Sequence, residues 1–191
     1  MGLDMYLHTN SKKVCEKAVE ATGGSSWHKV SGIAMYWRKA NAIHKWFVDN
    51  VQYGEDDCGS YEVSVEQLKE LRKTCKKVLK STKLVDTKVP NGYVMKDGKM
   101  VPYEMVDGKV LEDPSVAEEL LPTQEGFFFG GTEYDEYYWN DLERTVRGID
   151  AIMRSVERFE YAPFGDDYKW KEWREKGEGD WVVKFRYHSS W

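Results

Sequence analysis

The chain has 191 residues, 41% of them hydrophobic and 32% charged, and a net charge of -5 at pH 7. A chain of this length fits one domain that buries about 70% of the surface exposed in the unfolded state. The negative charge argues against non-specific binding to nucleic acid, which depends mainly on neutralised phosphates, but it is compatible with a local basic pocket for one small anion. Aromatic residues make up 14% of the sequence, and Tyr and Trp serve both cores and binding surfaces.

The cysteines and the N-terminus indicate the compartment. Cys15, Cys58 and Cys75 are an odd number without CxxC spacing, which favours reduced thiols. The first ten residues include an acid at position 4 and no long apolar run, so we expect no signal peptide. No stretch reaches the length of a membrane span. We therefore expect a cytoplasmic protein with no membrane partner.

The first predicted elements are a strand and a short helix. Residues 3–8 alternate between apolar and polar side chains, which is typical of a half-buried strand. Residues 11–22 predict a short helix that buries Val14, Ala18 and Val19. The glycines and serines at 23–26 then predict a loop.

Residues 35–48, MYWRKANAIHKWFV, are the most informative segment. Their apolar positions fit a 3.6-residue period, so we predict a single amphipathic helix with Ser31 as its N-cap. One row of this helix would lie at the edge of the core, where polar side chains can point into a pocket. That row contains Trp37, Asn41 and His44, and the more exposed side of the helix carries Arg38 and Lys45.

A loop and a second helix are predicted next. The acids at 55–57 stand beside glycines, which indicates a solvated turn first and a site for a hard cation second. Cys58 is expected to be a small buried side chain rather than a nucleophile. Residues 64–80 begin with capping-box spacing and continue with an apolar stripe, so they predict a helix with a basic outer face.

Residues 81–113 have the character of β-hairpins. Asp97-Gly98 and Asp107-Gly108 each lie between strand-forming residues, and Asp-Gly is a strong turn signal in that context. We therefore predict that residues 86–111 form a hairpin insertion, or flap, that projects from a single domain spanning 1–191.

A glycine-containing segment is predicted to lead into the longest helix. Residues 126–131, GFFFGG, precede this helix, and we expect Thr132 to be its N-cap and Asp135 its third residue. Carboxylates in the first turn, including Glu133, would complement the helix dipole and repel phosphate. The apolar period continues to Phe159, which makes this helix the main scaffold.

The C-terminal run predicts a strand that joins the first one. Residues 181–188 follow a charged connector, 163–180, and alternate like the N-terminal strand. The predicted fold class is therefore α+β. It has a small antiparallel sheet, formed by the N- and C-terminal strands, packed on three main helices. Trp191 is expected to be docked rather than frayed.

Five stretches outside the predicted hairpins and connector form a pattern. They are GLDMYL, YWRKANAIHKWF, DDCGSYEVS, LLPTQEGFFFGGTEYDEYYW and the terminal SSW. Together they cover most of the chain and resemble a family of small phage and prophage proteins. The resemblance implies expression in a bacterial host cytoplasm during infection, where short phage proteins often act against host pathways or defences. It implies no particular chemistry.

The first functional hypothesis is binding of a small anionic, nucleotide-like ligand between the helix predicted at 35–48 and the GFFFGG segment. Cations there would pair with phosphates, and aromatic side chains would stack on a base. Such a protein could sequester a host immune signal, and it would need neither metal nor cofactor. A homo-oligomer is compatible with this function. The candidate ligand-binding residues are Trp37, Arg38, Asn41, His44, Lys45, Phe128, Thr132, Glu133, Asp135 and Tyr137.

Two alternatives remain open at the level of sequence. One is a metal-assisted hydrolase or phosphoesterase, in which His44 is the acid or base and nearby carboxylates hold a metal or a water. Spacing alone identifies no nucleophile for it. The other is an interaction module that inhibits a host enzyme through the flap or the basic helix. Its signature would be exposed apolar residues in the flap, such as Tyr93, Met95 and Tyr103.

Overall fold

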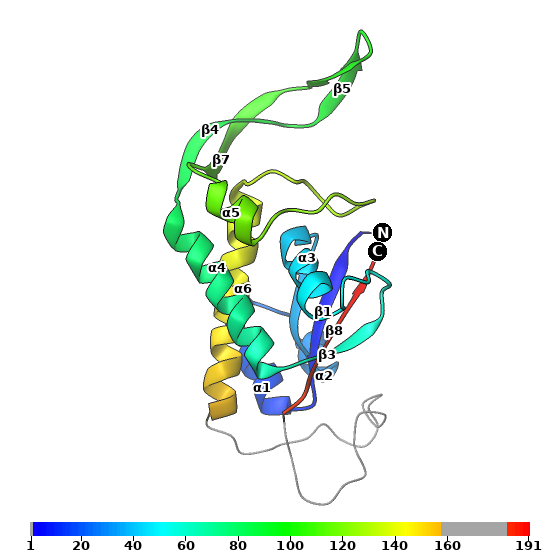
Figure 1. Cartoon of the computed structure of the whole chain (residues 1–191), viewed down its shortest axis with the longest axis vertical. Coiled ribbons are helices and arrows are strands. Elements are labelled where there is room, and N and C mark those ends of the chain that lie inside the picture. The colour runs from blue at the N-terminus through cyan, green and yellow to red at the C-terminus, as the bar shows by residue number, and fades with distance from the viewer. Residues whose placement is uncertain (1, 158–182) are drawn as a thin grey trace, which may run out of the picture.

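A computed structural model of the chain describes residues 2–157 and 183–191 and shows one α+β domain. An antiparallel four-stranded sheet joins the two ends of the chain (Figure 1), in the order β2-β1-β8-β3. As predicted, the N-terminal strand pairs with the C-terminal one. The strands are β1 (Asp4–Thr9), β2 (Ile33–Arg38), β3 (Ser60–Val63) and β8 (Phe185–Ser190).

Helices supply the other side of the core. In the long α6, Leu142, Ile149 and Ile152 are fully buried, and the helix packs against both α1 and α4. Figure 1 shows α4 and α6 side by side along the length of the molecule. No helix in the described part of the chain is long and apolar enough to cross a membrane. The helices are α1 (Lys12–Thr22), α2 (Ser26–Val30), α3 (Asn41–Asn50), α4 (Val65–Ser81), α5 (Ser115–Leu120) and α6 (Glu136–Glu157).

The elements predicted at 3–8, 11–22 and 64–80 are confirmed as β1, α1 and α4. The capping box of α4 forms as predicted: the Gln67 backbone N–H donates to Ser64 Oγ at 3.0 Å, and the Ser64 N–H donates to Gln67 Oε1 at 2.8 Å. In these segments the local pattern and the tertiary packing agree.

The prediction of one helix over 35–48 is wrong. β2 occupies residues up to Arg38, Lys39 makes a turn with φ 60, and α3 begins at Asn41. Pairing with β1, in which Met35 lies opposite Leu7, outweighs the helical period of the segment. The predicted N-cap is also wrong, because Ser31 ends α2 instead.

Residues 84–111 form a long two-stranded arm that projects beyond the helices (Figure 1). Its base is β4 (Leu84–Pro90) paired with β7 (Met105–Leu111), and its tip is β5 (Tyr93–Lys96) paired with β6 (Lys99–Pro102). The apolar side chains predicted to be exposed there are indeed exposed. They are Tyr93, Met95 and Tyr103, at 49%, 65% and 71%.

Only one of the two Asp-Gly pairs makes a turn. Asp97-Gly98 connects β5 and β6 as predicted, whereas Asp107-Gly108 lies inside β7. The strand pairing from the turn onward places Asp107 opposite Lys88, with which it forms an ion pair at 2.8 Å. A Cβ on Gly108 would lie 2.5 Å from Val89 Cγ2, so this glycine allows close cross-strand packing.

Three parts of the sequence-based prediction lie outside the described residues. They are the end of the long helix at Phe159, the connector 163–180, and the start of the last strand at residues 181–182.

Candidate functional site

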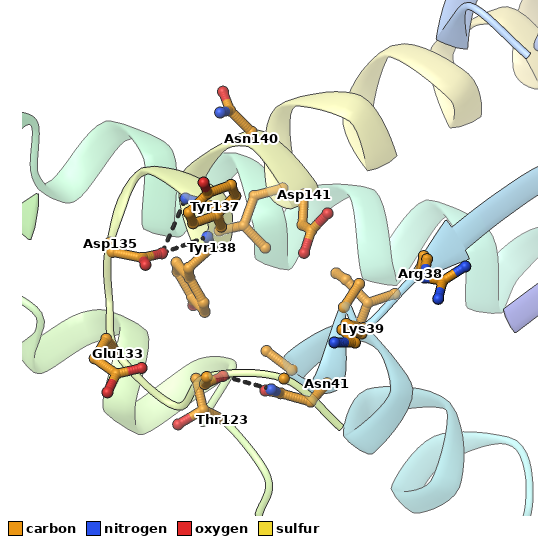
Figure 2. A pocket seen from close by; sticks show the side chains of 16 residues that line it. Arg38, Lys39, Asn41, Thr123, Glu133, Asp135, Tyr137, Tyr138, Asn140 and Asp141 are labelled. Carbon is orange, nitrogen blue, oxygen red and sulfur yellow. Dashed lines mark hydrogen bonds between the residues drawn. The ribbon is translucent and has the colours of Figure 1, made fainter. Parts of the chain in front are cut away.

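A pocket of about 370 Å³ opens where α3 and α6 both begin (Figure 2). Its first wall is the strand-to-helix turn at residues 38–43, and its second is the first two turns of α6. The segment from Thr123 to Glu133 closes it between them. The first wall is about 80 residues or more away in the sequence from the other two pieces, which follow one another along the chain.

The first wall is positively charged and begins with an uncapped helix. The N-cap of α3 is Ala40, no side chain caps the helix, and its first turn contains no acid. The first N–H groups of a helix lack partners within the helix and carry its positive dipole end, so they attract an anion. Arg38 and Lys39 stand immediately before this helix and are exposed. No carboxylate among the described residues forms an ion pair with either.

Backbone contacts hold this turn in place. The Lys39 N–H donates to the Leu3 carbonyl at 2.8 Å, and the Asn41 N–H donates to the Lys39 carbonyl at 2.9 Å. A Cβ on Gly130 would lie only 3.0 Å from the Cβ of Lys39, so the glycine lets the two segments approach closely. The turn that carries the two cations is therefore held in place by backbone hydrogen bonds and by close packing against the glycine-containing segment.

The second wall is negatively charged and begins with a capped helix. Asp135 Oδ1 accepts the backbone N–H groups of Tyr137 and Tyr138 at 2.9 and 3.0 Å, which makes Asp135 the N-cap of α6. The predicted cap, Thr132, is wrong. The chain ahead of the helix is held extended, because the Leu111 N–H donates to the Tyr134 carbonyl at 2.8 Å and Asp135 bridges to β7.

Asp141 adds a second carboxylate to this wall, and sequence reasoning missed it. Burial raises the pKa of Asp141 to about 7, with Arg144 lowering it and Asp135 raising it to smaller extents. No hydrogen bond from the described residues reaches its side chain. One signal could have identified it: Asp141 follows the buried Tyr138 by three positions and precedes the buried Thr145 by four. This spacing places an acid on the apolar face of the helix.

Asn41 ties the pocket together. Its Nδ2 donates to the carbonyls of Gly131 and Phe129 at 2.7 and 3.3 Å, and its Oδ1 accepts the Gln124 N–H at 3.2 Å. The side chain is 4% exposed. Asn41 therefore clamps the glycine-containing segment onto the start of α3.

The structure brings together half of the ten predicted site residues. Those that line the pocket are Arg38, Asn41, Glu133, Asp135 and Tyr137. Those that do not are Trp37, His44, Lys45, Phe128 and Thr132.

The excluded residues have other environments. Trp37 is buried in the core and donates from Nε1 to Thr145 Oγ1 at 2.8 Å. Lys45 forms an ion pair at 3.0 Å with Asp49, one turn along α3. Phe128 is 48% exposed with its ring centre 4.2 Å from that of its neighbour Phe127, and the Thr132 carbonyl accepts from Thr123 Oγ1 at 3.0 Å.

His44 does not have the surroundings of the acid or base predicted for the hydrolase alternative. It is fully buried, its Nδ1 lies 2.7 Å from the Tyr187 hydroxyl, and its Nε2 lies 3.0 Å from Asp56 Oδ2. Asp56 also accepts from Trp191 Nε1 at 3.1 Å. Both ring nitrogens are occupied, so His44 links the core to the C-terminus, and the predicted docking of Trp191 is confirmed.

The loop around Asp56 also differs from expectation at Cys58. This cysteine is exposed, so the prediction of a buried side chain is wrong. Within the described residues, no group of three or more His, Cys, Asp or Glu side chains is arranged to hold a metal ion.

Comparison with known proteins finds no family model, no curated protein and no solved structure that matches this chain. Its function is therefore inferred from the pocket itself.

Proposed function

We propose that the chain binds a small anionic, nucleotide-like ligand in this pocket. One observation carries the proposal: an uncapped helix N-terminus opens into the cavity beside Arg38 and Lys39, neither of which has an ion-pair partner among the described residues. Backbone N–H groups and a guanidinium together are a favourable environment for a phosphate, because Arg binds phosphate with two parallel hydrogen bonds.

The remaining surface of the pocket suits the rest of a nucleotide. Tyr137 is 80% exposed and lines the cavity, so its ring is available for stacking on a base. Carboxylates on the α6 side offer acceptors for ribose hydroxyls or amino groups. The volume of about 370 Å³ falls in the range of about 300–1,000 Å³ typical of small-molecule sites.

The resemblance to phage proteins suggests a setting for this activity. In a bacterial host cytoplasm, a protein with such a pocket would hold a host nucleotide signal and keep it from its receptor. Asp141 gives a specific reason to test turnover as well, since a carboxyl with a pKa near 7 suits general acid–base catalysis.

Isothermal titration calorimetry with nucleoside monophosphates and with inorganic phosphate tests the proposal. Arg38→Ala is expected to weaken nucleotide binding by about tenfold or more, because it removes a charge-assisted contact. Lys45→Ala is the matched control, since it removes the same charge close by but outside the pocket. Chromatography of the nucleotide after incubation shows whether it is cleaved.

Absence of binding by any nucleotide would refute the proposal. Equal losses in Arg38→Ala and Lys45→Ala would also count against the pocket, because they would reveal a general electrostatic attraction. Loss in Arg38→Ala alone supports it.

A further inference from the structure

On the α6 wall of the pocket, the Asp141 carboxylate has no hydrogen-bond or ion-pair partner among the described residues. Asp141 lies on α6 between the acidic start of that helix and the cationic wall (Figure 2). It is half-buried, and no described residue donates a hydrogen bond to it or forms an ion pair with it. Buried polar groups nearly always have partners, so an acceptor left open inside a cavity points to a ligand group that completes it.

The carboxylate that caps α6 is already in use. Asp135 caps its helix by accepting two backbone N–H groups, so its Oδ1 is committed to the fold. Of the acids within α6, Asp141 is the one that lines the pocket, so it is the acceptor on this helix that is open to a ligand. Tyr137 precedes Asp141 by four residues, which places the two side chains on the same face of α6.

This arrangement defines what the ligand must present. Its anionic group would sit at Arg38 and Lys39, its aromatic ring at Tyr137, and hydrogen-bond donors on the edge of that ring at Asp141. An ionised carboxylate only accepts, and its two oxygens match two parallel N–H donors. Among the nucleobases, guanine presents two such donors side by side, at N1 and at the 2-amino group. Adenine presents a single amino group next to an acceptor.

We propose that Asp141 is the specificity residue of the pocket and that it selects a guanine-type base through the paired N1–H and 2-amino donors. This inference rests on the proposed nucleotide-binding function and deepens it by naming the class of base.

Selection by an ionised Asp141 has a consequence for protons. The titratable and charged groups facing it come from all three pieces of the pocket. They are Asp135 ahead of α6, Tyr137, Tyr138 and Arg144 on α6, Arg38 and Lys39 on the opposite wall, and Glu133 between them. In the free protein burial holds the pKa of Asp141 at about 7. Two N–H donors stabilise the ionised form and lower that pKa, so guanine binding releases a proton near neutral pH. An adenine edge would instead favour a protonated Asp141 and take up a proton.

The experiment compares three ligands that share a ribose phosphate. Guanosine, inosine and adenosine 5′-monophosphates offer Asp141 two, one and a mismatched set of donors, respectively. Calorimetric titrations at pH 7 in two buffers of different ionisation enthalpy give both affinity and proton exchange. The wild type is expected to prefer guanosine over inosine monophosphate by about tenfold, and Asp141 is expected to release about half a proton on binding it, because a group with a pKa of about 7 is half ionised at pH 7.

Two substitutions complete the test. Asp141→Asn replaces two acceptors with one acceptor and one donor, a set that complements adenine. It should bring guanosine and inosine monophosphate within about threefold of each other, raise the relative affinity for adenosine monophosphate and abolish the proton release by Asp141. Asp150→Asn on the same helix is the matched control, because Asp150 pairs with Arg72 and Lys76 away from the pocket. It should leave the preference unchanged.

The outcomes separate the two proposals. Nucleotides that bind without a guanine preference, or a preference that survives Asp141→Asn, overturn the role of Asp141 and leave the nucleotide pocket standing. If no nucleotide binds, the proposed function falls and this inference with it. A guanine preference lost only in Asp141→Asn supports both.

Discussion

Replacing Asp141 with asparagine should stabilise the fold at and above neutral pH. The folded-state pKa of about 7 lies well above the ordinary carboxyl value of 3.8, so ionisation disfavours the folded state. Without screening, the difference corresponds to about 4 kcal/mol at pH 8. Because Asp141 faces a pocket that is open to water, we expect about half of this, or about 2 kcal/mol. Asparagine keeps the shape of the side chain and removes the charge.

The sign of the pH dependence follows from which state loses its proton first. As pH rises from about 4, the unfolded chain ionises Asp141 while the folded chain keeps it protonated, so the contribution of Asp141 to wild-type stability falls until about pH 7 and then levels off. The gain in Asp141→Asn should therefore be near zero at pH 4 and full at pH 8. Urea unfolding at pH 4, 6 and 8 measures it.

A variant with the opposite expected sign serves as the control. Asp150 accepts hydrogen bonds from the side chains of Arg72 and Lys76 on α4, so Asp150→Asn should lower the free energy of unfolding at pH 8 by about 1 kcal/mol. If Asp141→Asn were also destabilising at pH 8, the carboxylate would have to have a stabilising partner in the folded state. The account of an open acceptor would then be wrong.

Three further changes test the pocket and its framework. Ala40→Ser supplies α3 with a capping hydroxyl, so it should raise the free energy of unfolding by about 1 kcal/mol in urea unfolding and weaken phosphate binding in calorimetry. Asn41→Asp replaces a group that donates to two carbonyls with an acceptor, so it should lower the free energy of unfolding by about 3 kcal/mol at pH 8, more than Asn41→Ala does. An equal loss of stability in the two variants would contradict the role of Asn41 as a clamp. Burial and His188 lower the pKa of His8 to about 3, so the unfolded chain takes up its proton first below pH 6.5. The His8 contribution to stability should then fall by about 2 kcal/mol from pH 7 to pH 5, opposite in sign to the contribution of Asp141. In thermal unfolding, His8→Phe should therefore gain stability relative to the wild type as the pH falls over this range.

Much of the fold could be predicted from local pattern, and the failure at 35–48 shows where such pattern stops. Trp37 and Met35 alternate toward the core as strand residues do, yet the same letters also fit a helical period. The break between the two elements falls at Lys39, whose positive φ is uncommon for a residue that is not glycine. No glycine or proline marks the turn, so only the pairing with β1 reveals it.

The arm shows a similar limit on turn signals. Asp97-Gly98 and Asp107-Gly108 have the same dipeptide and similar flanking residues, but one makes a turn and the other lies within a strand. Once the first pair forms the turn, the register of the hairpin places the second pair inside β7, where it is paired with residues of β4. A two-residue signal fixes the local conformation of one site, and the position of every later residue depends on that choice.

The site could be anticipated in part, because the residues at 38–41 and 133–137 are polar or aromatic side chains at the ends of elements. The sequence placed Trp37 and His44 with them on the basis of a continuous helix, and the break at Lys39 removes that basis: Trp37 and His44 lie in the core. Asp141 was not predicted as a site residue, because the apolar positions around it indicate only a buried helix face and no motif marks the acid among them.

The pocket lies between two helix starts that differ in one respect. Asp135 neutralises the dipole of α6, whereas Ala40 leaves that of α3 open, although capping residues typically contribute about 1 kcal/mol. Arg38 and Lys39 increase the positive potential at this uncapped end rather than reducing it. In the free protein the N-terminus of α3 therefore lacks a stabilising capping interaction, and a bound anion would provide one at the same position. The missing cap coincides in one cavity with two cations that have no ion-pair partner among the described residues. A ligand that binds there should therefore raise the free energy of unfolding by an amount that grows with the logarithm of its concentration relative to its dissociation constant.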